Sequence, residues 1–259
     1  TEPSSGTDTS SLKTVARKDG NGGYVVNGQK IWTSRAEYSD LMVLLARTTP
    51  KEQARKRTEG LSVFLVDMRE ARKAGLTIRP IRTMMNHSTT EVFFTDMKVP
   101  AENLVGDEGK GFRYILSGMN AERILIASEC IGDAKWFIEK AGAYAKERVT
   151  FGKPLTQHQV IRHKLVDMAQ KVAVSQAWLE MLAWRLEQGE NPVAEICMLK
   201  NQSTQTLAFC ASEGVQIFGG AGFMRGAKVE RIYREVKVNA IGGGTEEIMK
   251  DLASRQLGF

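Results

Sequence analysis

Two adjacent side chains, Glu122 and Arg123, carry the strongest chemical signal in the sequence of 259 residues. Glu122 follows Met119 by three residues and precedes Ile126 by four, so helical periodicity places it on an apolar stripe. A carboxylate is costly to bury there unless it is paired or functional. Glu122 is therefore either part of a structural ion pair or a general base that removes a proton from a substrate. Glu129, one heptad later, is the weaker candidate because it lacks the adjacent arginine.

The glycine-rich segment 241–248 is a second chemical feature. Thr245 fits the N-cap of a helix, and the acidic residues after it, Glu247 among them, complement the helix dipole. The backbone N–H of Gly243 can donate to an oxygen on which negative charge develops. This pattern is compatible with a purely structural cap and with contact to a ligand.

Hydroxyl and aromatic residues early in the chain are compatible with a flat, nucleotide-like ligand. The loop 1–8 has small hydroxyl side chains and backbone amides that can hydrogen-bond a heteroaromatic ring or a pyrophosphate. Trp32 and Ser34 end a predicted strand, where an indole can stack on such a ring and a hydroxyl can bond its polar edge. The alternatives are an exposed surface turn and a tryptophan that fills the core.

Further polar candidates lie in the second half of the chain. Arg148 can bind a phosphate, although a surface salt bridge is the commoner role for an arginine at a helix end. The glycine pair Gly219-Gly220 permits a ligand to approach the backbone closely. The three histidines lack the spacing of metal ligands, and no metal site is predicted.

The hydrophobic pattern changes from strand-like to helical after Pro100. Strands are expected at 23–30, 41–46, 61–67, 76–81 and 91–99. Helices are expected at 111–147, 159–187, 192–218, 229–239 and 245–257. The predicted fold class is therefore α+β and multidomain. An antiparallel β-barrel or sandwich domain over residues 1–104 is followed by an all-α four-helix-bundle domain over residues 105–259.

Composition excludes several classes of protein. Hydrophobic residues make up 42% and charged residues 25%, which is typical of a soluble globular protein. The net charge is +6, but basic and acidic residues are interspersed, which argues against nucleic-acid binding. The three cysteines are isolated in apolar segments and indicate reduced thiols. No transmembrane segment is predicted, because no apolar run approaches roughly 20 residues.

Five motifs in one order resemble the acyl-CoA dehydrogenase family along the whole chain. They are TEPxxG(S/T)D from Thr1, the Trp-x-Ser strand end, RxxFGxP from Arg148, QxFGGxG from Gln216 and GGTxEI from Gly243. The resemblance implies a helical domain, a β domain and a four-helix bundle, of which the first is expected to precede this sequence. It also implies FAD as cofactor and dehydrogenation of an acyl-CoA thioester to the trans-2-enoyl-CoA.

The resemblance implies which residues bind the cofactor and the substrate. Flavin contacts are expected at Thr1, Thr7, Trp32, Thr33, Ser34, Thr245 and Glu247. Contacts to the adenine and pyrophosphate half of an FAD bound largely by a neighbouring subunit are expected at Arg148, Phe151, Gln159, Gln216, Gly219 and Gly220. Asn120 and Arg123 are expected to contact the CoA or thioester region, and Arg123 can equally hold Glu122 in place.

The position of the base departs from the commoner family pattern. Many family members carry a glutamate immediately before the Gly-Thr pair, where this sequence has Gly243. A branch that includes isovaleryl-CoA and long-chain acyl-CoA dehydrogenases carries the base in a Glu-Arg pair on the first long helix of the bundle. The sequence matches this branch, so the base is assigned to Glu122, and the Gly243 N–H is expected to contribute to an oxyanion site.

The resemblance also implies partners. They are an electron-transfer flavoprotein as electron acceptor and further copies of the chain in a homotetramer, a dimer of dimers. The protein is expected to be soluble, in the cytoplasm of a bacterium or the mitochondrial matrix of a eukaryote. Two alternatives on the same fold are a flavin-dependent oxygenase or oxidase and a non-catalytic relative used as an assembly surface. Glu122 beside Arg123 favours the dehydrogenase over both.

Overall fold

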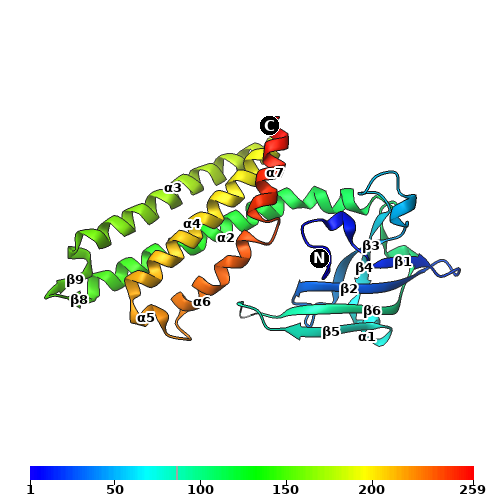
Figure 1. Cartoon of the computed structure of the whole chain (residues 1–259), viewed down its shortest axis with the longest axis horizontal. Helices are drawn as coiled ribbons and strands as arrows, with labels where there is room; N and C mark the ends of the chain where they lie inside the picture. The colour runs from blue at the N-terminus through cyan, green and yellow to red at the C-terminus, as the bar shows by residue number, and fades with distance from the viewer. Residues whose placement is uncertain (86) are drawn as a thin grey trace. The chain divides into compact units, whose positions relative to one another are not determined.

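The protein was analysed as a computed structural model, which describes residues 1–85 and 87–259. The chain forms two compact units, Thr1–Gly118 and Met119–Phe259 (Figure 1). The boundary falls inside the long helix α2 (Gly111–Glu147). The first turns of α2 belong to the β unit because Gly111 lies against the backbone of Ser62, where a Cβ atom would approach within 2.7 Å.

The first unit is built on one seven-stranded sheet with the order β5-β6-β2-β1-β3-β4-β7. Neighbouring strands are antiparallel except for β1 and β3, which are parallel. The strands are β1 (Val15–Lys18), β2 (Tyr24–Ser34), β3 (Leu41–Arg47), β4 (Leu61–Asp67), β5 (Leu76–Ile81), β6 (Thr89–Val99) and β7 (Leu104–Val105). Within the described residues β5 and β7 are the two ends of the sheet and do not pair, so the predicted closure into a barrel is not seen.

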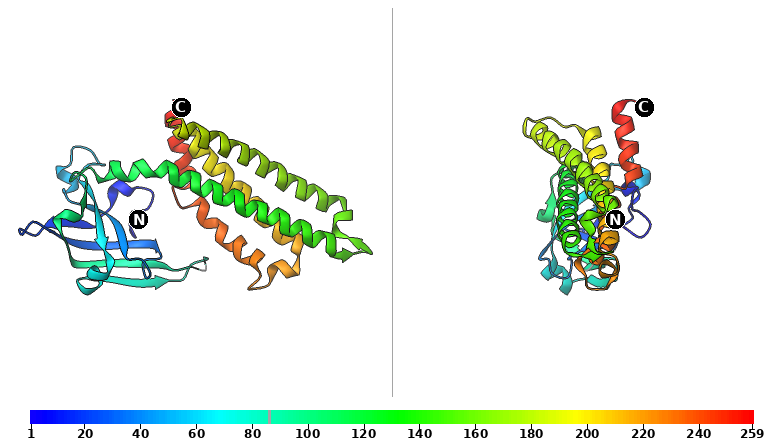
Figure 2. Two further views of the ribbon diagram at one scale, coloured as in Figure 1. Left: turned by 180° about the vertical axis from the view of Figure 1, so that it is seen from behind. Right: turned by 90° about the vertical axis from the view of Figure 1, so that its left-hand side faces the viewer.

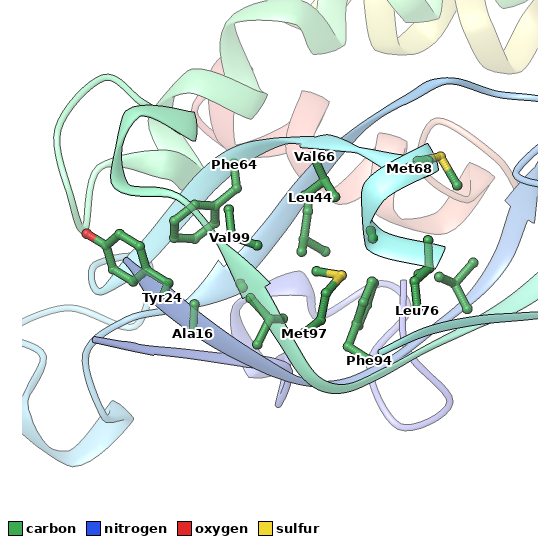
Figure 3. Packing of buried hydrophobic residues seen from close by; sticks show 14 of the residues in the cluster. Ala16, Tyr24, Leu44, Phe64, Val66, Met68, Leu76, Phe94, Met97 and Val99 are labelled. Carbon is green, nitrogen blue, oxygen red and sulfur yellow. The ribbon is translucent and has the colours of Figure 1, made fainter. Parts of the chain in front are cut away.

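The core of the β unit lies on the inner face of this sheet and beneath the short helix α1 (Met68–Lys73). Alternate residues of β2 point inward, as a strand period of two requires, and Tyr24 and Val26 are buried there. The rings of Tyr24 and Phe64 meet edge to face with their centroids 4.8 Å apart. Figure 3 shows this layer running from Tyr24 to Met68 and Leu76.

The second unit is helical, and α2, α3 (Gln159–Glu187) and α4 (Val193–Phe218) run alongside one another (Figures 1 and 2). Buried residues occur all around α4, so it is the central helix of the unit. The shorter helices are α5 (Gly220–Phe223), α6 (Lys228–Glu235) and α7 (Glu246–Leu257), and a two-stranded hairpin of β8 (Val149–Thr150) and β9 (Lys153–Pro154) connects α2 to α3. Short 3-10 turns lie at Thr9–Ser11, Lys51–Gln53, Ala101–Asn103, Leu155–Gln157 and Val236–Ala240.

The predicted elements agree with most of this architecture. Two strands and two helices have the predicted bounds, and most other ends differ by one or two residues. The exceptions are β2, which runs four residues further, to Ser34, and α6, which ends four residues earlier, at Glu235, before a 3-10 turn. The short strands β1 and β7 and the helix α1 were not predicted, because each is too short to show a period of its own. A mainly β unit followed by a helical unit is confirmed. The sheet is mixed rather than wholly antiparallel, because β1 pairs with β3 in parallel.

Close packing of α2 on α4 depends on a glycine. A Cβ atom at Gly214 would lie 2.4 Å from Cδ1 of Phe137, a fully buried ring in the core of the helical unit. Gly142, in contrast, lies within α2 with nothing within 4 Å of its Cβ position. The two positions differ in steric room, although both are helical.

This contrast predicts opposite effects of the same substitution. Gly214→Ala should lower the free energy of unfolding of the helical unit by roughly 1–3 kcal/mol, because the Phe137 ring must move. Gly142→Ala should raise it by up to about 1 kcal/mol, because alanine favours the helix. Urea unfolding followed by circular dichroism checks both variants. An equal effect of the two substitutions would contradict the packing described here.

Candidate functional site

One hydrogen bond brings together the two strongest sequence features of the helical unit. The guanidinium of Arg123 donates from Nε to the carbonyl oxygen of Gly243 over 3.3 Å, across 120 positions of sequence. Its Nη1 donates to Oδ1 of Asn120 over 3.0 Å. Arg123 is 7% exposed, so this anchor is buried. The glycine-rich loop is therefore fixed to the turn of α2 that carries Glu122.

A second buried cation holds the next peptide of the same loop. Lys200 on α4 is completely buried, and its Nζ donates to the carbonyl oxygen of Gly244 over 2.7 Å. Burial lowers the pKa of Lys200. The neighbouring Asn201 donates from Nδ2 to the carbonyl oxygen of Glu246 over 2.9 Å. The start of α7 is thus bonded to both α2 and α4.

The two acidic residues of the first turn of α7 have different surroundings. The Glu246 carboxylate accepts hydrogen bonds from Thr204 and Gln205 on α4. Glu247 is exposed, and the Oγ1 of Thr245 caps the helix by accepting from the Ile248 N–H over 3.3 Å. The structural cap anticipated for Thr245 is present, and Glu247 is the acidic side chain available to a ligand.

Gly243 has a conformation that disfavours a side chain. Its φ is +65°, in the left-handed region, and a Cβ atom there would lie 2.6 Å from Cδ1 of Ile126. A non-glycine residue would incur backbone strain of about 1–2 kcal/mol and would have to displace the end of the Ile126 side chain. Glycine at the commoner base position of the family therefore agrees with the local geometry.

Glu122 does not lie on a buried stripe, and that expectation was wrong for the described chain. The buried seam of α2 starts at Arg123 and continues through Ala127 and Cys130. Glu122 precedes Arg123 by one position, which turns it by about 100° from the seam onto an exposed face. Leu125, three residues on and on the same face, is 68% exposed. The carboxylate is accessible beside an apolar side chain.

The residues predicted to bind the adenine and pyrophosphate half of FAD gather at the opposite end of α2. Stacking of Tyr144 on Phe218, with centroids 4.5 Å apart, brings the end of α2 beside the end of α4. The predicted residues near this contact are all exposed, and they are Arg148, Phe151, Gln159, Gln216, Gly219 and Gly220. Phe151 is 97% exposed with a φ of +51°, an unusual conformation for an aromatic residue.

These two groups of the helical unit are far apart. From Arg123 to Glu147 the helix α2 advances by about 36 Å at 1.5 Å per residue. This separation exceeds the length of a single extended dinucleotide.

In the β unit, a buried ion pair anchors the chain segment next to Trp32. Nζ of Lys30 lies 2.8 Å from Oε1 of Glu2, and the Glu2 carboxylate also accepts the N–H groups of Lys13 and Thr14. The Ile31 N–H donates to the Thr1 carbonyl over 3.0 Å. Burial alone would raise the pKa of Glu2, but these hydrogen bonds outweigh it and lower the pKa to about 2. For Lys30, burial outweighs the ion pair and lowers the pKa.

The strand end at Trp32 is distorted and open. The pairing of β2 with β6 shifts register between Lys30 and Thr33, and Trp32 within this bulge has a φ of +63°. Trp32 is 59% exposed, so it does not fill the core. Strained, exposed aromatic residues are typical of ligand sites. Ser34 and Thr7 are likewise exposed.

A small cavity of about 180 Å³ opens beside this strand end and is lined in part by Thr1, Thr33 and Lys30. A larger groove of about 830 Å³ in the same unit is lined by charged residues such as Glu70 and Lys98 and by none of the predicted site residues. Of these two cavities, only the smaller one is lined by residues predicted to bind a ligand, Thr1 and Thr33.

Sequence patterns missed two of the anchoring residues. Glu2 was noted only as part of the first motif, and Lys200 was not noted at all. Lys200 follows the buried Ile196 by four positions and precedes the buried Leu207 by seven, so its helical spacing was the signal that could have found it.

Comparison with known proteins agrees with the architecture and the motifs. Residues 1–97 match the family model for the acyl-CoA dehydrogenase middle domain, and residues 109–258 match the model for the C-terminal domain. The chain is 36% identical to an acyl-CoA dehydrogenase of Bacillus subtilis over 99% of this chain and 66% of that protein. It is 32% identical to the mitochondrial long-chain specific acyl-CoA dehydrogenase of Sus scrofa over 99% of this chain and 59% of that protein.

A solved structure described as the FAD complex of PigA is 27% identical, with a TM-score of 0.90 over 100% of this chain and 66% of that one. The chain belongs to the acyl-CoA dehydrogenase family. It spans less than two thirds of the length of both curated relatives. Among the described helices, none is long and apolar enough to cross a bilayer.

The Glu2–Lys30 pair predicts a pH-dependent stability. Because the folded pKa of Glu2 lies below its ordinary value of 4.5, the carboxylate stabilises the fold above about pH 4.5 and loses this effect as the pH falls towards about 2. At neutral pH, Glu2→Gln should lower the free energy of unfolding by on the order of 2–3 kcal/mol. The difference from the parent should shrink below pH 4.5.

Urea unfolding at several pH values between 7 and 3 measures this difference. Glu102→Gln, at an exposed position, is the matched control and should remain close to the parent at every pH. A Glu2→Gln deficit that is independent of pH would show that the ion pair does not stabilise the fold.

Proposed function

We propose that the protein is an FAD-dependent acyl-CoA dehydrogenase in which Glu122 is the base. The observation that carries the proposal is the Arg123–Gly243 hydrogen bond, because it fixes the glycine loop to the turn of α2 that presents Glu122. The carboxylate is exposed and close to Leu125, an apolar side chain suited to an acyl chain. Gly243, at the alternative base position, has no side chain.

The residues of the β unit fit a flavin. Trp32 offers an exposed indole, and Thr1 and Thr33 line a cavity with polar groups. We propose that these residues, with Thr7 and Ser34, contact the flavin. In the helical unit, Thr245 and Glu247 are proposed as cofactor contacts in their own right. When bound, FAD supplies the acceptor for the hydrogen that leaves Cβ with its electron pair.

The protein's own chemistry in this reaction is proton removal and charge stabilisation. Glu122 takes the α-proton of the thioester, and the electron pair of that C–H bond forms the α,β double bond as hydride leaves Cβ. Negative charge develops on the thioester oxygen in this step. Backbone N–H groups of the glycine loop are suited to stabilise it. The product is the trans-2-enoyl-CoA.

We further propose that the FAD site is shared between copies of the chain. The exposed group around Arg148 and Gln216 is about 36 Å along α2 from the turn that carries Glu122, so it would serve the cofactor of another copy. A homotetramer built as a dimer of dimers is consistent with this arrangement, and an electron-transfer flavoprotein is the proposed acceptor. Asn120 and Arg123 are proposed at the thioester end of the substrate.

Anaerobic mixing of the full-length, FAD-loaded protein with a panel of acyl-CoAs tests the activity. We expect flavin absorbance to bleach with at least one thioester and the corresponding enoyl-CoA to form. If no thioester bleaches the flavin, but the protein consumes oxygen when NADH reduces the flavin, the protein would instead be an oxygenase or oxidase. Protein that binds no FAD would indicate a non-catalytic relative.

Substitution of Glu122 tests the base. Glu122→Gln should slow bleaching by about 10²–10⁴-fold, because a positioned general base contributes that much to the rate. Glu129→Gln, an exposed position two turns further along α2, should bleach at the parent rate. Stopped-flow absorbance measures flavin bleaching in both variants. If the flavin of Glu122→Gln bleaches at the parent rate, Glu122 is not the base.

A further inference from the structure

Three consecutive backbone N–H groups of the glycine loop have no acceptor among the described residues. They belong to Gly243, Gly244 and Thr245, whereas the Gly242 N–H donates to the Val238 carbonyl over 2.7 Å. Both Gly243 and Gly244 have positive φ, at +65° and +105°. Successive free N–H groups in such turns form concave sites for negatively charged oxygen.

The carbonyl groups of two of these peptides are held by buried cations. Arg123 bonds the Gly243 carbonyl, whose peptide carries the Gly244 N–H, and Lys200 bonds the Gly244 carbonyl, whose peptide carries the Thr245 N–H. The described chain has no cis peptide bonds, so each N–H points away from the cation bonded to its carbonyl. The cations therefore direct both N–H groups away from the packed interior of α2 and α4.

The charges of these cations are not neutralised by ion pairs. Neither Arg123 nor Lys200 has a carboxylate within 4.0 Å among the residues that the structure describes. The Glu246 carboxylate, which still influences Lys200, is bonded to Thr204 and Gln205. Buried cations without an ion-pair partner are expensive and are stabilised by negative charge that develops nearby.

We propose that Lys200 is a positioning residue for the reaction, acting with Arg123. Its hydrogen bond to the Gly244 carbonyl holds the glycine loop, so that the free N–H groups of Gly243, Gly244 and Thr245 stay directed to the thioester oxygen as the α-proton leaves. Lys200 itself, completely buried, does not touch the substrate. This inference rests on the proposed dehydrogenase function and adds a requirement for a side chain that lies outside every family motif identified in the sequence.

The test uses full-length, FAD-loaded protein with Lys200→Met, which keeps the length of the side chain and removes its charge. Lys135→Met, an exposed lysine on α2, is the matched control. We expect Lys200→Met to lower the rate of flavin bleaching at saturating acyl-CoA by at least about tenfold, part of the 10²–10³-fold that an oxyanion donor contributes. KM should change by less than about threefold, and the control should match the parent.

A spectroscopic readout separates positioning from a general loss of structure. The infrared carbonyl band of an acyl-CoA labelled with carbon-13 at the thioester carbon should move to lower frequency on binding the parent protein. It should move less on binding Lys200→Met. Lys200→Gln keeps an N–H donor to the Gly244 carbonyl without the charge, and its shift should be intermediate.

The outcomes distinguish this inference from the proposed function. If no acyl-CoA bleaches the parent protein, the proposed function fails and the inference fails with it. If the parent bleaches while Lys200→Met or Lys200→Gln retains the full rate and the full carbonyl shift, only the role of Lys200 is overturned. If neither variant binds FAD, the test is the carbonyl band of the labelled acyl-CoA on the parent protein. An unshifted band there would overturn hydrogen-bond donation from the loop.

Discussion

Two buried cations, Arg123 and Lys200, hold the carbonyl groups of Gly243 and Gly244, and the proposed chemistry depends on this attachment. Because the helices that carry the cations pack around Phe137 and Gly214, the position of the loop is set by the core of the helical unit. The same contacts fix the start of α7. These contacts therefore restrict a short glycine segment, which would otherwise have many conformations, to a single conformation.

The β unit uses a comparable device. The Glu2–Lys30 pair and the bond between Ile31 and Thr1 tie the first residues to β2 immediately before the bulge at Trp32. In both units a buried charge orients the backbone. The residues proposed to contact the cofactor remain exposed beside these anchors. This division explains why an exposed, strained residue such as Trp32 persists in a well-packed protein.

The sequence predicted the main helices and strands well because their periodic segments are long. The helices of residues 111–147 and 159–187 have the predicted bounds, and the motifs identified the correct family. The burial of Glu122 was predicted wrongly, because a one-residue shift rotates a helix position by about 100° and periodicity alone does not fix the seam. The helical spacing of Lys200 indicates that it is buried, but no sequence pattern encodes its partner, a backbone carbonyl 44 positions away. Pairing of β1 with β3 in parallel is likewise a tertiary property.

The proposed reaction depends on one arrangement, in which the helix turn of Glu122 and the loop of Gly243 act on the same thioester. A crystal structure of the full-length protein with FAD and a 3-thia-acyl-CoA, an analogue that can lose its α-proton but resists dehydrogenation, tests this most directly. We expect a carboxylate oxygen of Glu122 within hydrogen-bonding reach of the α-carbon and at least one N–H of Gly243, Gly244 or Thr245 on the thioester oxygen. A thioester bound away from the loop, or a different carboxylate at the α-carbon, would contradict the account.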